Sequence, residues 1–110
     1  MPKFVTIGYG DRAGYDKPPQ DIRNAAHEHD RQLQDEGALL GIAGMPVQVR
    51  NTLGAKVETT TGAYMSSSLP VAGFAIIEAE DLSTAIRSVS KAPCAVAYGV
   101  VEVWPLEQRC

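Results

Sequence analysis

The last third of the chain limits the possible folds more than any other part, because residues 73–106 read as strand, helix and strand with short connections. Residues 73–79 form a short apolar run that is typical of a well-buried strand. Residues 99–104 alternate in the manner of a half-buried strand, and Pro105 is expected to stop that strand because proline has no amide donor. This order predicts an α+β sandwich.

Between these two strands the sequence predicts a capped helix. Asp81 can accept hydrogen bonds from the free amides of a first turn, and Pro93 is expected to end the helix at or before residue 92. A single apolar stripe is expected to face the sheet. It consists of Leu82, Ala85, Ile86 and Val89.

The N-terminal part of the chain follows the same order. Residues 4–9 predict a strand, and residues 11–17 predict a loop. Pro18-Pro19 can open a helix because the first turn needs no amide donors there. Gly37 supplies the left-handed residue that closes this helix, and residues 38–42 predict the next strand. The apolar stripe of the helix is expected to consist of Ile22, Ala25, Ala26, His29 and Leu33.

A hairpin is expected between the two halves, with strands at residues 47–50 and 56–60. Two helices then cover one face of an antiparallel sheet, which is the α+β ferredoxin-like sandwich. The length of 110 residues allows a single domain, residues 1–110. Because the strand at 73–79 is apolar on both faces, we expect a homodimer that packs sheet to sheet.

Composition and charge exclude several classes of function. The net charge is −3 and the ten Lys and Arg residues are spread along the chain, so we expect no nucleic-acid binding. Apolar runs are too short for a membrane span, and the start of the chain reads as a strand where a signal peptide would stand. The two cysteines are expected to be free thiols in a reducing cytoplasm, which makes the protein cytoplasmic.

We expect neither a cofactor nor a metal. Gly8-Tyr9-Gly10 follows a strand, but it lacks the third glycine of a dinucleotide fingerprint. His27 and His29 stand two positions apart, a spacing that splays their rings on a helix and makes a poor metal clamp.

Short motifs along essentially the whole chain resemble the YCII-related family of the DGPF type. They include residues 7–11 after the first strand, residues 36–39 at the helix-to-strand turn and residues 99–103 in the last strand. The turn where that family has Asp-Gly-Pro-Phe reads Thr61-Gly62-Ala63-Tyr64. The resemblance implies a ferredoxin-like dimer of the same broad kind as muconolactone isomerase and dimeric α/β-barrel proteins, with a cleft beside the sheet.

The sequence also departs from that family. Thr61 replaces the turn aspartate, Ala63 replaces the proline, and Trp104 replaces the arginine that is usual in the final strand. These changes predict a cleft that is more neutral and more aromatic than in the family.

His29 is the candidate catalytic residue, because it lies on an apolar stripe and an imidazole that titrates near neutral pH can move a proton to or from a substrate. The alternative is a neutral core histidine that is bonded to a backbone carbonyl. His27 is rotated away from the stripe and is expected to face solvent. The candidate substrate-binding residues come from strand ends and the modified turn, and they are Tyr9, Asp11, Arg12, Tyr64 and Trp104.

Two functions follow from these observations. The first is a small cofactorless enzyme, an isomerase, lyase or cyclase that transfers a proton on a cyclic or aromatic small molecule in the cleft; the resemblance and His29 favour it. The second is a non-catalytic protein that binds a small molecule, or acts as an accessory protein, through the dimer cleft. The loss of the family's charged turn residues favours this second function.

Overall fold

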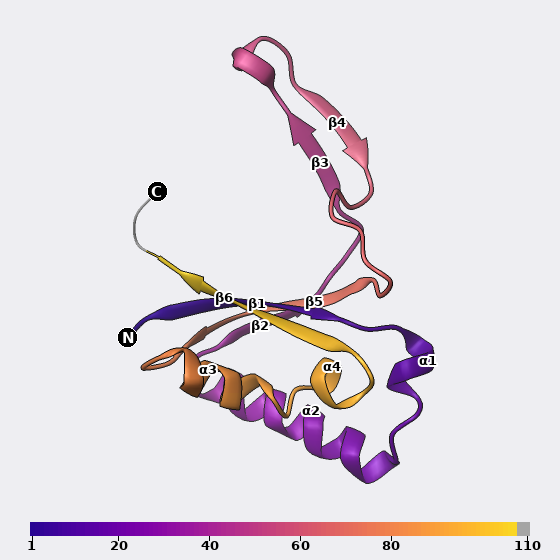
Figure 1. Ribbon diagram of the computed structural model, residues 1–110, viewed down its shortest axis with the longest axis vertical. Helices are drawn as coiled ribbons and strands as arrows, with labels where there is room; N and C mark the ends of the chain where they lie inside the picture. Colours follow the sequence, from indigo (N-terminus) through magenta and orange to yellow (C-terminus); the bar gives the residue numbers. More distant parts are fainter. Residues whose placement is uncertain (108–110) are drawn as a thin grey trace.

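The computed structural model describes residues 1–107, which form a four-stranded antiparallel sheet, a helix layer and a separate hairpin (Figure 1). The sheet has the strand order β2-β5-β1-β6 and all of its neighbouring pairs are antiparallel. Its strands are β1 (Lys3–Tyr9), β2 (Leu39–Ile42), β5 (Val71–Glu78) and β6 (Val100–Leu106). The hairpin comprises β3 (Val47–Arg50) and β4 (Glu58–Thr61), with the short 3-10 turn η1 (Thr52–Gly54) near its tip.

The helices lie on one side of the sheet, while the hairpin rises on the other side (Figure 1). They are α1 (Arg12–Tyr15), α2 (Gln20–Asp35), α3 (Leu82–Val89) and α4 (Pro93–Val96). This strand order, with helical crossovers after β1 and β5, is a ferredoxin-like α+β sandwich and confirms the predicted fold class.

Local signals in the sequence account for the ends of the two long helices. Pro19 precedes the first turn of α2, and Gly37 follows its last turn with a φ of 104°. The amide of Ala38 then donates to the carbonyl of Leu33 at 2.9 Å, which satisfies a helix-end acceptor. Asp81 begins α3 as expected, because its carboxylate accepts from the amide of Thr84 at 2.8 Å.

The apolar stripe predicted for α2 is right in part, because Ala26, His29 and Leu33 lie on the inward side of the helix. Ala26 and Leu33 are buried, but Ile22 is 44% exposed and Ala25 faces solvent. The inward face of α2 also carries partly buried charged residues, and these are Arg23 and Asp30.

The stripe predicted for α3 is half right. Ala85 and Val89 are buried, at 0% and 7% exposure, whereas Leu82 and Ile86 remain about half exposed. The helix has only eight residues and contacts the core through its two smaller side chains.

Pro93 agrees with the prediction, because α3 ends at Val89, whereas Pro105 does not. Pro93 opens the unpredicted helix α4 at its first position, where its missing amide costs nothing. Pro105 does not stop β6, which continues to Leu106. Because β6 is an edge strand, a residue without an amide donor can be accommodated there with no loss of a ladder bond. The loop predicted over residues 11–17 also contains a short helix, α1.

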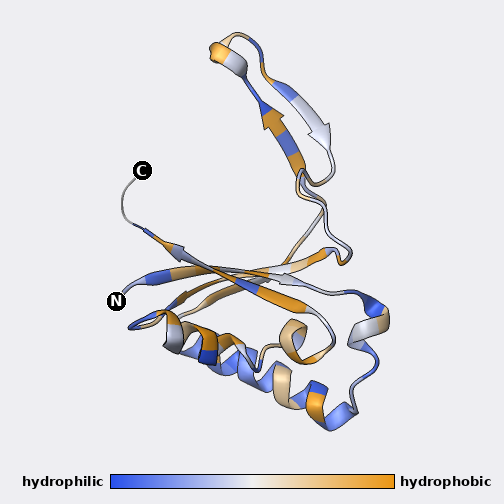
Figure 2. Ribbon diagram, viewed as in Figure 1, coloured by the Kyte–Doolittle hydropathy of each residue, from blue (hydrophilic) through white to orange (hydrophobic). Residues whose placement is uncertain are grey.

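Alternation along β5 divides the sheet into a covered and an uncovered face. Ala75 and Ile77 point into the core beneath the helices, whereas Phe74 and Ile76 are 49% and 38% exposed. We call the uncovered side the open face; Figure 2 shows how apolar these strands are compared with α2. Alternation and strand register place the following exposed apolar side chains on the open face: Leu39, Phe74, Ile76, Val100, Trp104 and Leu106.

The two neighbouring isoleucines of β5 offer a matched test of this division. Ile77→Ala should lower the free energy of unfolding by about 2–5 kcal/mol, because it empties a buried site. Ile76→Ala should cost clearly less in a dilute sample, because that side chain is already partly in water. Urea denaturation of both variants checks the pair, and equal losses would contradict the assignment of the two faces.

Candidate functional site

The chain turns sharply where β1 ends, and Asp11 fixes this turn. Its carboxylate accepts from the amide of Gly14 at 2.8 Å and thereby caps α1. Gly14 is buried against the end of α4, where a Cβ would lie 3.0 Å from the carbonyl oxygen of Ala97. A larger residue at position 14 would push α1 away, so this close approach determines where the next residue, Tyr15, is held.

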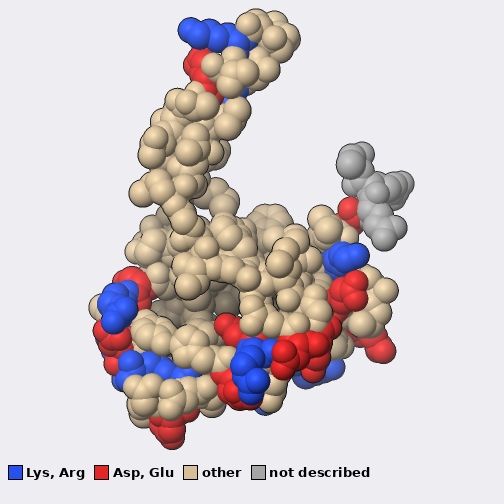
Figure 3. Space-filling model, turned by 180° about the vertical axis from the view of Figure 1, so that it is seen from behind, with Lys and Arg blue, Asp and Glu red and all other residues tan. Residues whose placement is uncertain are grey.

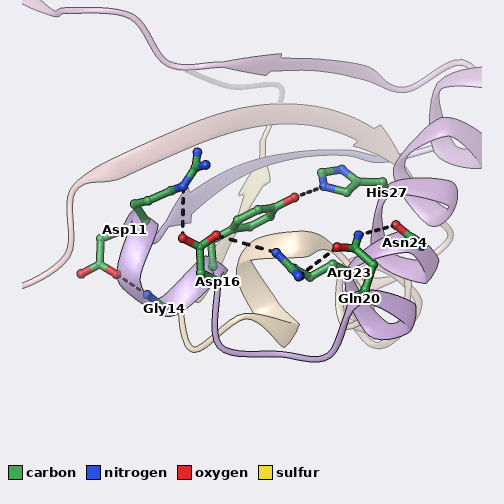
Figure 4. A network of polar contacts seen from close by, with 9 residues as sticks. Asp11, Gly14, Asp16, Gln20, Arg23, Asn24 and His27 are labelled. Atoms are coloured by element: carbon green, nitrogen blue, oxygen red, sulfur yellow. Dashed lines mark hydrogen bonds and ion pairs between the residues drawn. The ribbon is translucent and has the colours of Figure 1, made fainter.

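Tyr15 reaches from α1 to α2, where its hydroxyl and the Nε2 atom of His27 are 2.5 Å apart (Figure 4). The two rings meet edge to face, with centroids 5.8 Å apart. His27 is exposed, as expected, but it is bonded to Tyr15 and not simply solvated. A hydroxyl joined to an imidazole is a pair through which a proton can move.

Arg23 lies beside this pair and is held by groups from both helices. Its guanidinium carbon is 5.8 Å from the ring centroid of Tyr15, and one amino group donates to Gln20 at 2.9 Å. Asp16 stands 3.7 Å from Arg23 and also accepts from Arg12 at 3.2 Å. The Nε atom of Arg23 is buried and has no hydrogen-bond partner among residues 1–107. That N–H is a donor that the described residues leave unsatisfied.

Seen from behind, the surface is hollowed between the sheet and α2 on the side of α1, with charged side chains along its margins (Figure 3). We refer to residues 11–27, where α1 and the start of α2 are in contact, as the α1–α2 corner. Asp30, one turn further along α2, is half-buried. Desolvation raises the pKa of its carboxyl group, while the nearby charges of His29 and His27 act in the opposite direction.

Cys94 lies at the start of α4 and is a half-buried free thiol. Burial, followed by the charge of Asp30, raises its pKa, so the thiolate is disfavoured. Its Sγ atom would be 2.9 Å from a Cβ at position 8, which explains the glycine in β1. Cys94 therefore has the character of a packing residue; Cys110 lies outside the described residues.

His29 lies between the helices, apart from the α1–α2 corner. Its Nε2 atom donates to the carbonyl oxygen of Ser88 at 2.5 Å. This carbonyl belongs to the last turn of α3, where carbonyl groups lack partners within the helix. The contact ties α2 to α3 and supports the alternative of a core histidine; a role as a base stays a prediction.

On the open face, Tyr9 and Trp104 meet at one carboxylate. The hydroxyl of Tyr9 donates to Oε1 of Glu102 at 2.7 Å, and Nε1 of Trp104 is 3.4 Å from the same oxygen. The hydrogen bond to Glu102 raises the pKa of Tyr9, with burial and the carboxylate charge adding to it. The sequence prediction missed Glu102, although its alternation with Trp104 was the signal that places it on this face.

The six predicted site residues therefore fall in four places. Asp11 and Arg12 belong to the α1–α2 corner, Tyr9 and Trp104 to the open face, and His29 to the helix layer. Tyr64 is 79% exposed at the base of the hairpin, where its ring centroid lies 5.7 Å from the guanidinium of Arg50. The residues that prediction missed at the corner are Tyr15, Arg23 and His27.

A family model described as the YCII-related domain matches residues 3–108, almost the whole chain. The chain belongs to the YCII-related family. No curated protein matches it significantly. The turn that replaces the family's DGPF motif places Gly62 at a φ of 112°, a left-handed conformation that favours glycine. Within residues 1–107, the structure contains no helix long and apolar enough to cross a bilayer.

Replacement of His29 tests its two possible roles. His29→Ala should lower the free energy of unfolding by about 1–3 kcal/mol, because the carbonyl of Ser88 loses its donor. Urea denaturation measures this loss, and activity should fall only with the folded fraction. A variant of unchanged stability that has lost all activity would instead establish His29 as a catalytic base.

Asp30 makes stability depend on pH. The pKa of Asp30 is raised in the folded state, so folding favours the protonated carboxyl group. The resulting contribution to the free energy of unfolding is complete below about pH 4, the pKa of an unperturbed aspartate. It is lost as the pH rises through the folded pKa. Asp30→Asn should therefore melt like the wild type in acid and at a higher temperature at pH 7. Asp21→Asn, in the first turn of α2, should be destabilised at pH 7 through the helix dipole. Melting curves at both pH values check the contrast.

Proposed function

We propose that this protein is a cofactor-independent enzyme of the isomerase, lyase or cyclase type, which transfers a proton on a cyclic or aromatic small molecule at the α1–α2 corner. The observation that carries the proposal is the 2.5 Å contact between the Tyr15 hydroxyl and Nε2 of His27, beside the buried and unpartnered Nε of Arg23 among the described residues. Base, proton carrier and oxyanion donor are thus provided by two short segments of chain.

The chemistry needs no group beyond these side chains. His27, directly or through the Tyr15 hydroxyl, takes a proton from a carbon next to a carbonyl group. The electrons of the broken C–H bond form an enolate, and Arg23 donates a hydrogen bond to the oxygen that becomes negative. Return of the proton to a different carbon completes an isomerisation, and loss of a leaving group in its place gives an elimination.

The surroundings of the pair support a small, largely uncharged substrate with a single polar end. Charged side chains stand at the margins of the hollow, and at the corner the Arg12, Asp16 and Arg23 charges are already paired (Figure 4). An apolar ring with a carbonyl oxygen suits such a site, because it leaves few polar groups without partners.

We also propose that the working form is a homodimer joined through the open face. The apolar side chains there are 38% to 68% exposed on a chain of 110 residues, which is a contiguous patch of the kind that marks an interface. Packing against a second sheet would remove this surface from water.

The second candidate function is non-catalytic binding of a small molecule. The exposed positions of His27 and of Tyr64 favour it, because neither side chain is enclosed as catalytic groups usually are. In this case the Tyr15–His27 pair holds a ligand and transfers no proton.

Deuterium exchange distinguishes the two functions. Wild-type protein is incubated in D2O with a panel of cyclic ketones and unsaturated lactones, and proton NMR follows the loss of signal next to the carbonyl. For an enzyme, His27→Gln and Tyr15→Phe should each slow exchange by about 100-fold or more. Gln34→Ala, on an exposed position of α2, is the control and should exchange like the wild type.

Two results would count against catalysis. Exchange that is equally fast in the wild type and both variants would remove the Tyr15–His27 pair from the mechanism. A compound that raises the melting temperature of the wild type, and of neither variant, without any exchange would identify a binding protein.

A further inference from the structure

The hairpin is an arm that stands apart from the rest of the molecule. We call residues 46–62 the arm; it rises on the open-face side of the sheet (Figure 1) and contributes to the longest dimension of the molecule, 52 Å. Its neck is closed by the amide of Gly62, which donates to the carbonyl of Pro46 at 2.9 Å. A two-stranded hairpin without tertiary contacts is only marginally stable in water, so an ordered arm calls for a packing partner.

The two sides of the arm differ in character. Val47 pairs with Thr61 and Val49 with Thr59, so one side consists of β-branched residues. The other side is polar and consists of Gln48, Arg50, Glu58 and Thr60. The two valines are 57% and 67% exposed. An amphipathic hairpin with its apolar side in water is an interaction surface, because β-branched side chains are most stable when packed on a pleated surface.

Charge indicates which partner fits. The stem of the arm is uncharged and its charges gather toward the tip (Figure 3). On the open face, the described strands place one ion pair at the rim, Lys3 with Glu78 at 3.6 Å, and the hydrogen-bonded carboxylate of Glu102. A nucleic acid or an anionic membrane would need a basic surface. Two copies of one chain bring identical patches together, and a nearly neutral patch avoids self-repulsion.

The exposed area is sufficient for such a contact. A large apolar side chain has a surface area on the order of 150–250 Å². The exposed apolar side chains of the open face and of the arm together have an exposed area on the order of 1,000 Å². A stable interface buries about 800 Å² per partner. The arm contributes the two valines, and Met45, next to its neck, is 77% exposed.

We propose that the arm clasps a second copy of this chain, with its Val47–Val49 side packed against the partner that is docked on the open face. The proposal rests on the homodimer of the proposed function and adds the element that holds it. Facing sheets pack about 10 Å apart and a strand rises about 3.3 Å per residue, so an arm of six or seven residues in each direction spans roughly 20 Å. It therefore reaches past the partner's sheet to the level of the partner's helices.

Sedimentation of three full-length variants and one armless chain tests the proposal. Val49→Lys should weaken the dimer at least about tenfold, because a lysine would be buried without a partner. Thr60→Lys adds the same charge on the polar side of the arm and should change the dissociation constant by less than about threefold. Phe74→Lys, on the open face, should weaken the dimer with the arm intact.

In the armless chain, Asn-Gly replaces residues 47–61. The hydrogen bond between Pro46 and Gly62 is the bond that a two-residue turn would close. The sheet should therefore fold as in the wild type, which circular dichroism can check. The armless dimer should dissociate at least about tenfold more readily than that of the wild type.

Each outcome is decisive. The arm proposal is overturned if the armless chain or the Val49→Lys variant dimerises as tightly as the wild type. If only Phe74→Lys weakens the dimer, the homodimer through the open face is retained without a role for the arm. A wild-type chain that sediments as a monomer at micromolar concentration overturns both, and co-flotation of that monomer with uncharged phosphatidylcholine vesicles would identify a lipid surface as the occupant. None of these measurements depends on catalytic activity.

Discussion

The contact between the inner face of the sheet and a thin helix layer is the constraint on which the rest of this structure depends. The core consists of Phe4 and Ile77 surrounded by alanine and valine, and among residues 1–107 no large side chain is completely buried. Small side chains let α3 approach the sheet closely, but they bury little apolar area. A chain of this length therefore gains limited stability from its own interior and keeps apolar surface available for association.

The α1–α2 corner lies outside this core. Arg23 and His27, in the first half of α2, contact the short helix α1. Partial burial at the corner restricts the motion of its polar side chains without removing all water. In such an environment the side chains of a tyrosine, a histidine and an arginine can form hydrogen bonds to a ligand. The corner is thus built by contacts between two helices and not by the sheet.

Sequence patterns predicted the strands and the two long helices because hydrophobic alternation, Asp81 and Gly37 are local signals. They were incomplete on the faces of α2, because the direction in which a helix faces is decided by contacts with distant segments. Offsets from Ile22 selected His29, which is partly buried as expected, but they missed Arg23 and Asp30 on the same inward side. Tyr15 could not be linked to His27 from sequence, since α1 was taken as a loop and the contact depends on Gly14 fitting against α4.

The bonded neck between Pro46 and Gly62 has a consequence for how this fold tolerates change. Strands β2 and β5 are antiparallel neighbours in the sheet, so the shortest connection between them is a simple turn, and everything beyond the neck is extra chain. Residues could be added to or removed from that segment in pairs without altering the register of any strand in the sheet. The arm can then vary in length and sequence while the sheet and its helices stay fixed.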